Sequence, residues 1–135
     1  MSWDFELVAG PYGGTSEGPV WDGQAMLFTD IPNSLIMRYD PETGECTEWR
    51  TGTNGTNGLN FDLQGRLYGC SGGGRTILYF DPDGANIPLP NLLGGKRHNT
   101  PNDLAIDRKG RIWFTDPNGR LSGEEREIDH SSVLR

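Results

Sequence analysis

The sequence has no run of about 18 apolar residues, the length that a membrane-spanning helix needs. Its start, Met-Ser-Trp-Asp-Phe-Glu, also lacks the basic and apolar regions of a signal peptide. These two absences make a cytoplasmic location, with no membrane partner, the default expectation.

Cysteines and basic residues are both scarce. Cys46 and Cys70 are the two cysteines, and they have neither the spacing of a metal-binding pair nor the number that a disulfide framework needs. We expect both to be reduced, half-buried strand residues. The chain has 12 Lys and Arg against 19 Asp and Glu, and its formal net charge is −7. Such a charge repels phosphate backbones, so nucleic acid is not expected as a partner.

Long segments free of glycine and proline are missing. The chain contains 20 glycines and 9 prolines, and before Gly123 no stretch without either is longer than nine residues. The pieces between them are strand-sized and rich in apolar and aromatic residues, for example 25–29 and 111–115. The sequence therefore predicts an all-β chain. Residues 124–135 are long enough for a helix, but their pattern fits a loop followed by a strand better.

The sequence repeats itself at intervals of 40 to 45 residues. Residues 57–68 align with 102–113 without a gap, and residues 35–41 align in the same way with 76–82. Each unit reads as four strands joined by an Asp-x-x-Gly turn, a loop and an Asp-Pro-x-Gly turn. Four antiparallel strands at this period are typical of a β-propeller blade, whereas a β-sandwich has no reason to repeat its sequence.

Three such units are present, and we expect blades at residues 15–53, 54–98 and 99–135, the third of them incomplete. Residues 3–9 look like a strand that would pair with a closing blade. A propeller closes with roughly four to eight blades, because an open arc leaves strand edges unpaired. We therefore expect an incomplete propeller domain, from which the C-terminal half of the ring is missing.

Oxygen-bearing side chains stand at the start of the innermost strand of each predicted blade: Glu17, Asn57 and Asn102. Inner strands converge at one mouth of the central channel, so these side chains can share a ligand. Carboxylate and amide oxygens suit a hard cation such as Ca²⁺, which takes more than three of them. A central metal is the prediction. The alternative is that each Asn only stabilises a turn and that Glu17 is a solvated loop end.

Two motifs resemble the SMP-30/gluconolactonase family. The segment Glu17-Gly-Pro-Val-Trp is similar to the family's opening motif, and residues 95–104 with 110–117 are similar to the segment around its Pro-Asn-Asp core. The resemblance covers the whole chain, as the N-terminal half of a six-bladed ring. It implies that Glu17 is a metal ligand and Asn102 a metal or substrate ligand. Asn57 and Asp103 are further candidates for substrate binding.

The resemblance also implies that an Asn and an Asp in later blades complete the metal site, the Asp serving as catalytic base. No catalytic residue is therefore expected in this chain. The chain departs from many such lactonases after Cys70, where it has Ser-Gly-Gly instead of Glu-His-Gly. A substrate contact that the His makes in relatives is not expected here.

The implied activity is metal-dependent hydrolysis of a sugar lactone or related ester. Ca²⁺, or else Mg²⁺, Mn²⁺ or Zn²⁺, would polarise the carbonyl while a carboxylate activates water. Two alternatives stay open: a non-catalytic propeller that binds a protein or small ligand, and a truncated chain without activity. The oligomeric state is left open.

Other polar residues have simpler readings. His98 and His130 lie in predicted loops without a nucleophile motif, so a serine or cysteine hydrolase gains no support. Residues 72–74 are three glycines without the Lys and helix of a phosphate loop, and a hairpin turn is expected there. Asp30 and Asp116 either cap strand ends or touch substrate.

Three aromatic residues, Trp21, Trp113 and Phe114, lie in predicted strands. Their large apolar area suits the interior between two sheets. We expect all three to pack between blades.

Overall fold

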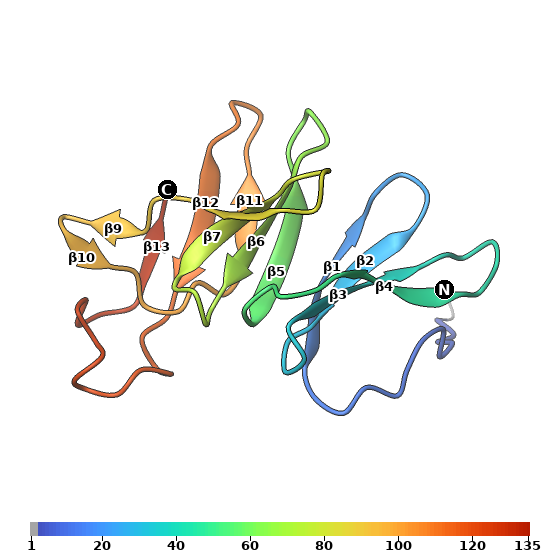
Figure 1. Cartoon of the computed structure of the whole chain (residues 1–135), viewed down its shortest axis with the longest axis horizontal. Helices are drawn as coiled ribbons and strands as arrows, with labels where there is room; N and C mark the ends of the chain where they lie inside the picture. The colour runs from blue at the N-terminus through green and yellow to red at the C-terminus, as the bar shows by residue number, and fades with distance from the viewer. Residues whose placement is uncertain (1–2) are drawn as a thin grey trace.

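The computed structural model describes residues 3–135 and consists of strands and loops (Figure 1). Three antiparallel sheets follow one another along the chain and lie side by side. The first sheet contains β1 (Ser16–Trp21), β2 (Met26–Asp30), β3 (Leu35–Tyr39) and β4 (Cys46–Arg50). The second sheet contains β5 (Thr56–Phe61), β6 (Leu67–Ser71), β7 (Thr76–Phe80) and β8 (Asn86–Pro88). The third sheet contains β11 (Leu104–Ile106), β12 (Ile112–Asp116) and β13 (Ser132–Leu134), and a hairpin of β9 (Leu92–Leu93) and β10 (Lys96–Arg97) precedes it.

The all-β prediction is confirmed, and within each sheet every strand pairs with its neighbour in sequence. Residues 124–135 form a loop followed by β13, as expected, and no helix among residues 3–135 could cross a membrane. The sheets fall inside the ranges 15–53, 54–98 and 99–135, whose limits stay a prediction. In the described part of the chain, residues 3–15 form no strand, so the pairing of residues 3–9 with a closing blade also stays a prediction.

The Asp-x-x-Gly turns hold the first two strands of a sheet in register. One carboxylate oxygen of Asp62 accepts hydrogen bonds from the main-chain N–H groups of Gln64 and Arg66, both at 2.9 Å. Asp107 does the same for the turn before β12, where Arg111 also donates from Nε at 2.6 Å. Main-chain N–H groups in a tight turn have no partner on a neighbouring strand, and the Asp carboxylate binds them instead. The repeat of Asp and Gly therefore has a direct structural cause.

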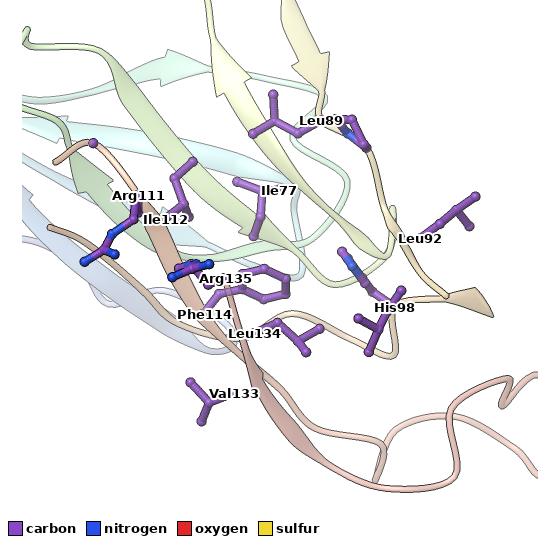
Figure 2. Close-up of a pocket in the computed structure, with 13 residues that line it drawn as sticks. Ile77, Leu89, Leu92, His98, Arg111, Ile112, Phe114, Val133, Leu134 and Arg135 are labelled. Atoms are coloured by element: carbon purple, nitrogen blue, oxygen red, sulfur yellow. The ribbon is translucent and has the colours of Figure 1, made fainter. Parts of the chain in front are cut away.

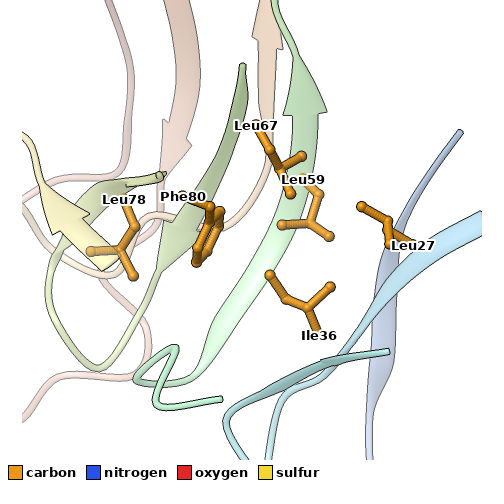
Figure 3. Close-up of a cluster of buried hydrophobic side chains, with 6 residues drawn as sticks. All are labelled: Leu27, Ile36, Leu59, Leu67, Leu78 and Phe80. Atoms are coloured by element: carbon orange, nitrogen blue, oxygen red, sulfur yellow. The ribbon is translucent and has the colours of Figure 1, made fainter. Parts of the chain in front are cut away.

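Apolar side chains from facing sheets form the core. The cluster between the first and second sheets is shown in Figure 3 and consists of Leu27, Ile36, Leu59, Leu67, Leu78 and Phe80. A second cluster, between the second and third sheets, contains Cys70, Ile77, Leu104 and Phe114. Burying each large side chain contributes about 1.5–3 kcal/mol. Packing between sheets is therefore what fixes each sheet beside the next.

Strand alternation corrects one expectation about the aromatic residues. Phe114 is buried in the second cluster, as expected, but Trp113 is 39% exposed and Trp21 is 50% exposed. Successive strand side chains point to opposite faces, so Trp113 faces away from the second sheet when Phe114 faces it. Likewise Val20, not Trp21, packs against the first cluster. Cys46 and Cys70 are free thiols, and Cys70 is fully buried.

Candidate functional site

The inner strands β1, β5 and β11 begin at the same end of the three sheets, here called the mouth. The main-chain N–H of Gly58 donates a 2.8 Å hydrogen bond to the carbonyl oxygen of Asn102. A Cβ at Gly58 would lie 2.7 Å from the Cα of Asp103, and a Cβ at Gly18 would collide with the carbonyl oxygen of Asn57. Only glycine permits such close approach of two backbones. The structure thus brings the starts of the three inner strands together in the order 17, 57, 102.

Strand pairing places the three candidates at matching heights. Glu17 pairs with Thr29 of β2, whose Oγ1 donates to the Glu17 carbonyl oxygen at 3.0 Å. The main-chain N–H of Asn102 donates to the carbonyl oxygen of Thr115 on β12, also at 3.0 Å. Asn57 lies in the irregularity of β5 between the Thr56 and Leu59 pairs. The three residues thus occupy equivalent positions at the same end of their sheets.

The three side chains differ in exposure. Glu17 is exposed, Asn102 is half-buried, and Asn57 is 3% exposed. Within residues 3–135, the buried Nδ2 of Asn57 has no hydrogen-bond partner. An unpaired buried donor is costly, so this amide weakens the start of β5 unless it is paired. Asn102 lines a hollow of about 450 Å³ together with Thr115, Pro117, Ser131, Ser132 and Val133.

Asp103 makes hydrogen bonds to residues of β11 and β12. Its Oδ1 accepts a hydrogen bond from the Leu104 N–H at 2.9 Å, and its N–H donates to Thr115 Oγ1 at 3.1 Å. The residue is exposed at the start of β11. These bonds give it a structural task, and its role in substrate binding stays a prediction.

Asp30 and Asp116 end β2 and β12 and are buried. Asp116 Oδ2 accepts from the Asn99 N–H at 2.8 Å, and Asp30 Oδ2 accepts from Asn33 Nδ2 at 2.9 Å. Burial raises the pKa of Asp116 above its ordinary value, although the Asn99 N–H opposes the shift. Of the two open readings, these contacts support strand-end caps.

The segment before Asn102 is fixed by residues that the sequence did not single out. Thr100 Oγ1 donates to the Pro117 carbonyl oxygen at 2.7 Å, and Asn99 Nδ2 donates to the His130 carbonyl oxygen at 3.0 Å. Both residues lie inside the motif that carries the family resemblance. The run of polar side chains directly before Pro101 was the sequence feature that could have indicated this role.

The donor atoms at the mouth are all oxygen or amide groups. One carboxylate and two amides suit Ca²⁺ or Mg²⁺, whereas Zn²⁺ favours nitrogen and sulfur ligands. Among residues 3–135 no three His, Cys, Asp or Glu side chains gather into a metal site. Glu17 and Asn102 thus carry oxygen donors of the kind that a hard cation binds, and their role as metal ligands stays a prediction.

A larger hollow of about 620 Å³ lies away from Asn102, between β7 and the β12–β13 pair (Figure 2). Its walls include Ile77, Phe114 and Leu134, which continue the second core cluster. His98 packs against Phe114 with ring centroids 5.1 Å apart, and burial lowers the pKa of this His. These contacts describe a gap in the packing of two sheets, not a set of polar groups that converge on a ligand.

The family model for the SMP-30/Gluconolactonase/LRE-like region matches residues 15–135. The chain belongs to this family. A gluconolactonase of Zymomonas mobilis is 29% identical to it over 140 residues, which cover 89% of this chain and 39% of that protein. The structure of XC5397, a gluconolactonase of Xanthomonas campestris, matches with a TM-score of 0.79 and 36% identity, over 87% of this chain and 42% of that one.

A second, more distant structure shows the common fold. Regucalcin of Agrobacterium tumefaciens, a calcium-binding protein, matches with a TM-score of 0.63 and 19% identity, over 88% of this chain and 45% of that one. The chain thus spans less than half the length of each of these relatives. The three sheets are part of a propeller of the SMP-30/gluconolactonase type, and the family prediction is confirmed.

Proposed function

We propose that this chain supplies the first part of a metal-dependent lactonase site. The observation that supports it most is the shared mouth: the Gly58–Asn102 bond and the tight packing at Gly18 bring Glu17, Asn57 and Asn102 to one end of adjacent inner strands. Gluconolactonases of Zymomonas mobilis and Xanthomonas campestris are among the relatives. A sugar lactone or a related ester is therefore the proposed substrate class.

Each residue has a distinct task in this proposal. The Glu17 carboxylate and the Asn102 amide oxygen hold a divalent cation, and Ca²⁺ is the first choice because calcium-binding regucalcin belongs to the same family. The bound cation supplies Lewis-acid polarisation of the ester carbonyl. Asn57, which lies beside Glu17 and Asn102 at the start of β5, contacts the substrate and so orients the ring. The base that activates water is proposed to lie in a later blade.

Hydrolysis of a sugar lactone by a complete ring that contains this chain tests the proposal. We expect turnover that a chelator abolishes and that added Ca²⁺ restores. Glu17→Gln should lose most of the activity, since it removes the charge that binds the cation. The matched control is Glu48→Gln, the same change at an exposed position of β4. Equal turnover in the two variants, or turnover that resists the chelator, would show that the assignment is wrong.

A further inference from the structure

Arg75 is a buried cation at the mouth side of the second sheet. It follows the three glycines 72–74 in the hairpin between β6 and β7, and it is 8% exposed. Its backbone is in the left-handed region, with a φ of 54°, and a residue other than glycine adopts that conformation at a cost in free energy. A buried guanidinium in a strained position requires compensating contacts.

Those contacts are main-chain carbonyl oxygens from two other segments. Arg75 Nε donates to the carbonyl oxygens of His98 at 2.7 Å and Asn99 at 3.2 Å, and Nη1 donates to that of Glu125 at 3.1 Å. The nearest carboxylate, on Glu127, is 4.0 Å from Nη1. The planar fork of arginine can reach several acceptors at once, which a single ammonium cannot do.

Of the two segments that Arg75 holds, one leads into Asn102 and the other lines the hollow beside Asn102. Residues 97–101 lead directly into Asn102, and residues 117–131 connect β12 to β13, with Pro117 and Ser131 lining the hollow. A second tie joins the same segments, since Glu127 accepts from the N–H of Arg97 at 2.8 Å and from its Nε at 2.6 Å. That second pair is exposed and contributes less.

We infer that Arg75 is a positioning residue for Asn102: its guanidinium binds the carbonyl oxygens of residues 98, 99 and 125, and it thereby fixes the segment that leads into Asn102 and the loop that lines the hollow beside it. The sequence around Arg75 carries no sign of this role, because its partners are main-chain atoms more than 20 residues away. The consequence for metal binding rests on the proposed function. The expected effect on the rigidity of the two segments does not depend on the proposed function.

Arg75→Lys tests the inference, because it keeps the charge and removes the fork. Arg111→Lys is the matched control: Arg111 also donates from Nε, to Asp107, but in a turn at the far end of β12. Amide hydrogen exchange should accelerate in residues 97–102 and 117–131 by about tenfold or more in Arg75→Lys, the loss expected for one hydrogen bond to a charged group. The other strands and the Arg111→Lys chain should exchange as the wild type does.

Ca²⁺ titration of complete rings that contain these chains provides the functional readout, and Arg75→Lys should bind Ca²⁺ more weakly by a similar factor. Unchanged exchange in both segments would overturn the inference. Equal acceleration throughout the chain, including unfolding, would also overturn it, because Arg75 would then serve only general stability. If the wild type binds no Ca²⁺, the proposed function fails, while the exchange pattern still decides the role of Arg75.

Discussion

The N–H of Gly58 donates a 2.8 Å hydrogen bond to the carbonyl oxygen of Asn102, so that two inner strands of different sheets are joined near their starts. A side chain at position 58 would occupy the space of Asp103. The close approach of these backbones, and not a loop, sets how far apart the candidate ligands on β5 and β11 lie. Substitutions at the contact between Gly58 and residues 102–103 should therefore change both the stability of the chain and the geometry of the candidate site.

Gly58→Ala should destabilise the chain by about 1–3 kcal/mol, the usual cost of forcing extra volume into a packed contact. The added Cβ would lie 2.7 Å from the Asp103 Cα, which is backbone and cannot rotate away. Urea unfolding followed by tryptophan fluorescence measures the change. Gly119→Ala is the control, since a Cβ there meets nothing within 4 Å. A Gly58→Ala chain as stable as the control would refute the close approach.

Ile36→Ala tests the core between the first and second sheets. The Ile36 side chain is fully buried in the cluster of Figure 3, and its truncation should cost about 2–5 kcal/mol. The comparison is Leu63→Ala, since Leu63 is 73% exposed. Thermal unfolding should show a clear loss for Ile36→Ala and little change for Leu63→Ala. Similar melting of both variants would mean that the two sheets do not pack as described.

Ionisation of Asp116 should destabilise the folded chain as the pH rises. Burial raises its pKa in the folded chain above the ordinary 3.8, so the folded state holds this proton more tightly than the unfolded state does. The contribution is complete below pH 3.8 and is lost as the pH rises through the folded pKa. Asp116→Asn cannot ionise and keeps an oxygen that accepts from Asn99.

The stability of Asp116→Asn relative to the wild type should therefore increase as the pH rises from about 4 to about 7. Urea unfolding at several pH values measures it. Asp83→Asn, which removes a carboxylate from an exposed turn, is the matched control. A difference between Asp116→Asn and the wild type that stays constant or shrinks with rising pH would contradict the assigned direction of the pKa.

The sheets could be predicted because their cause is local and repeated. Asp62 and Asp107 hold their turns through bonds to residues two and four positions later, so the repeat of Asp and Gly is visible in the sequence. The same repeat predicts the matching positions of Glu17, Asn57 and Asn102. Their approach in space depends on Gly18 and Gly58, which occur beside them in the motif.

The remaining features depend on distant partners. The carbonyl oxygens that bind Arg75 belong to residues 98, 99 and 125, and main-chain atoms leave no trace in residue type. The exposure of Trp113 follows from which face of β12 meets the second sheet, and an aromatic pair such as Trp113–Phe114 does not reveal this by composition. The short hairpin of β9 and β10 also has no counterpart in the repeat.

We propose that Glu17 and Asn102 bind one cation, and a calorimetric titration with Ca²⁺ of a complete ring that contains this chain tests this directly. We expect binding by the wild type and by Glu48→Gln, and affinity reduced by about tenfold or more in Glu17→Gln, which loses the negative charge, and in Asn102→Ala, which loses the oxygen ligand. Circular dichroism of each variant should match the wild type. Absence of Ca²⁺ binding by the wild type, or equal affinity in all four chains, would contradict the claim.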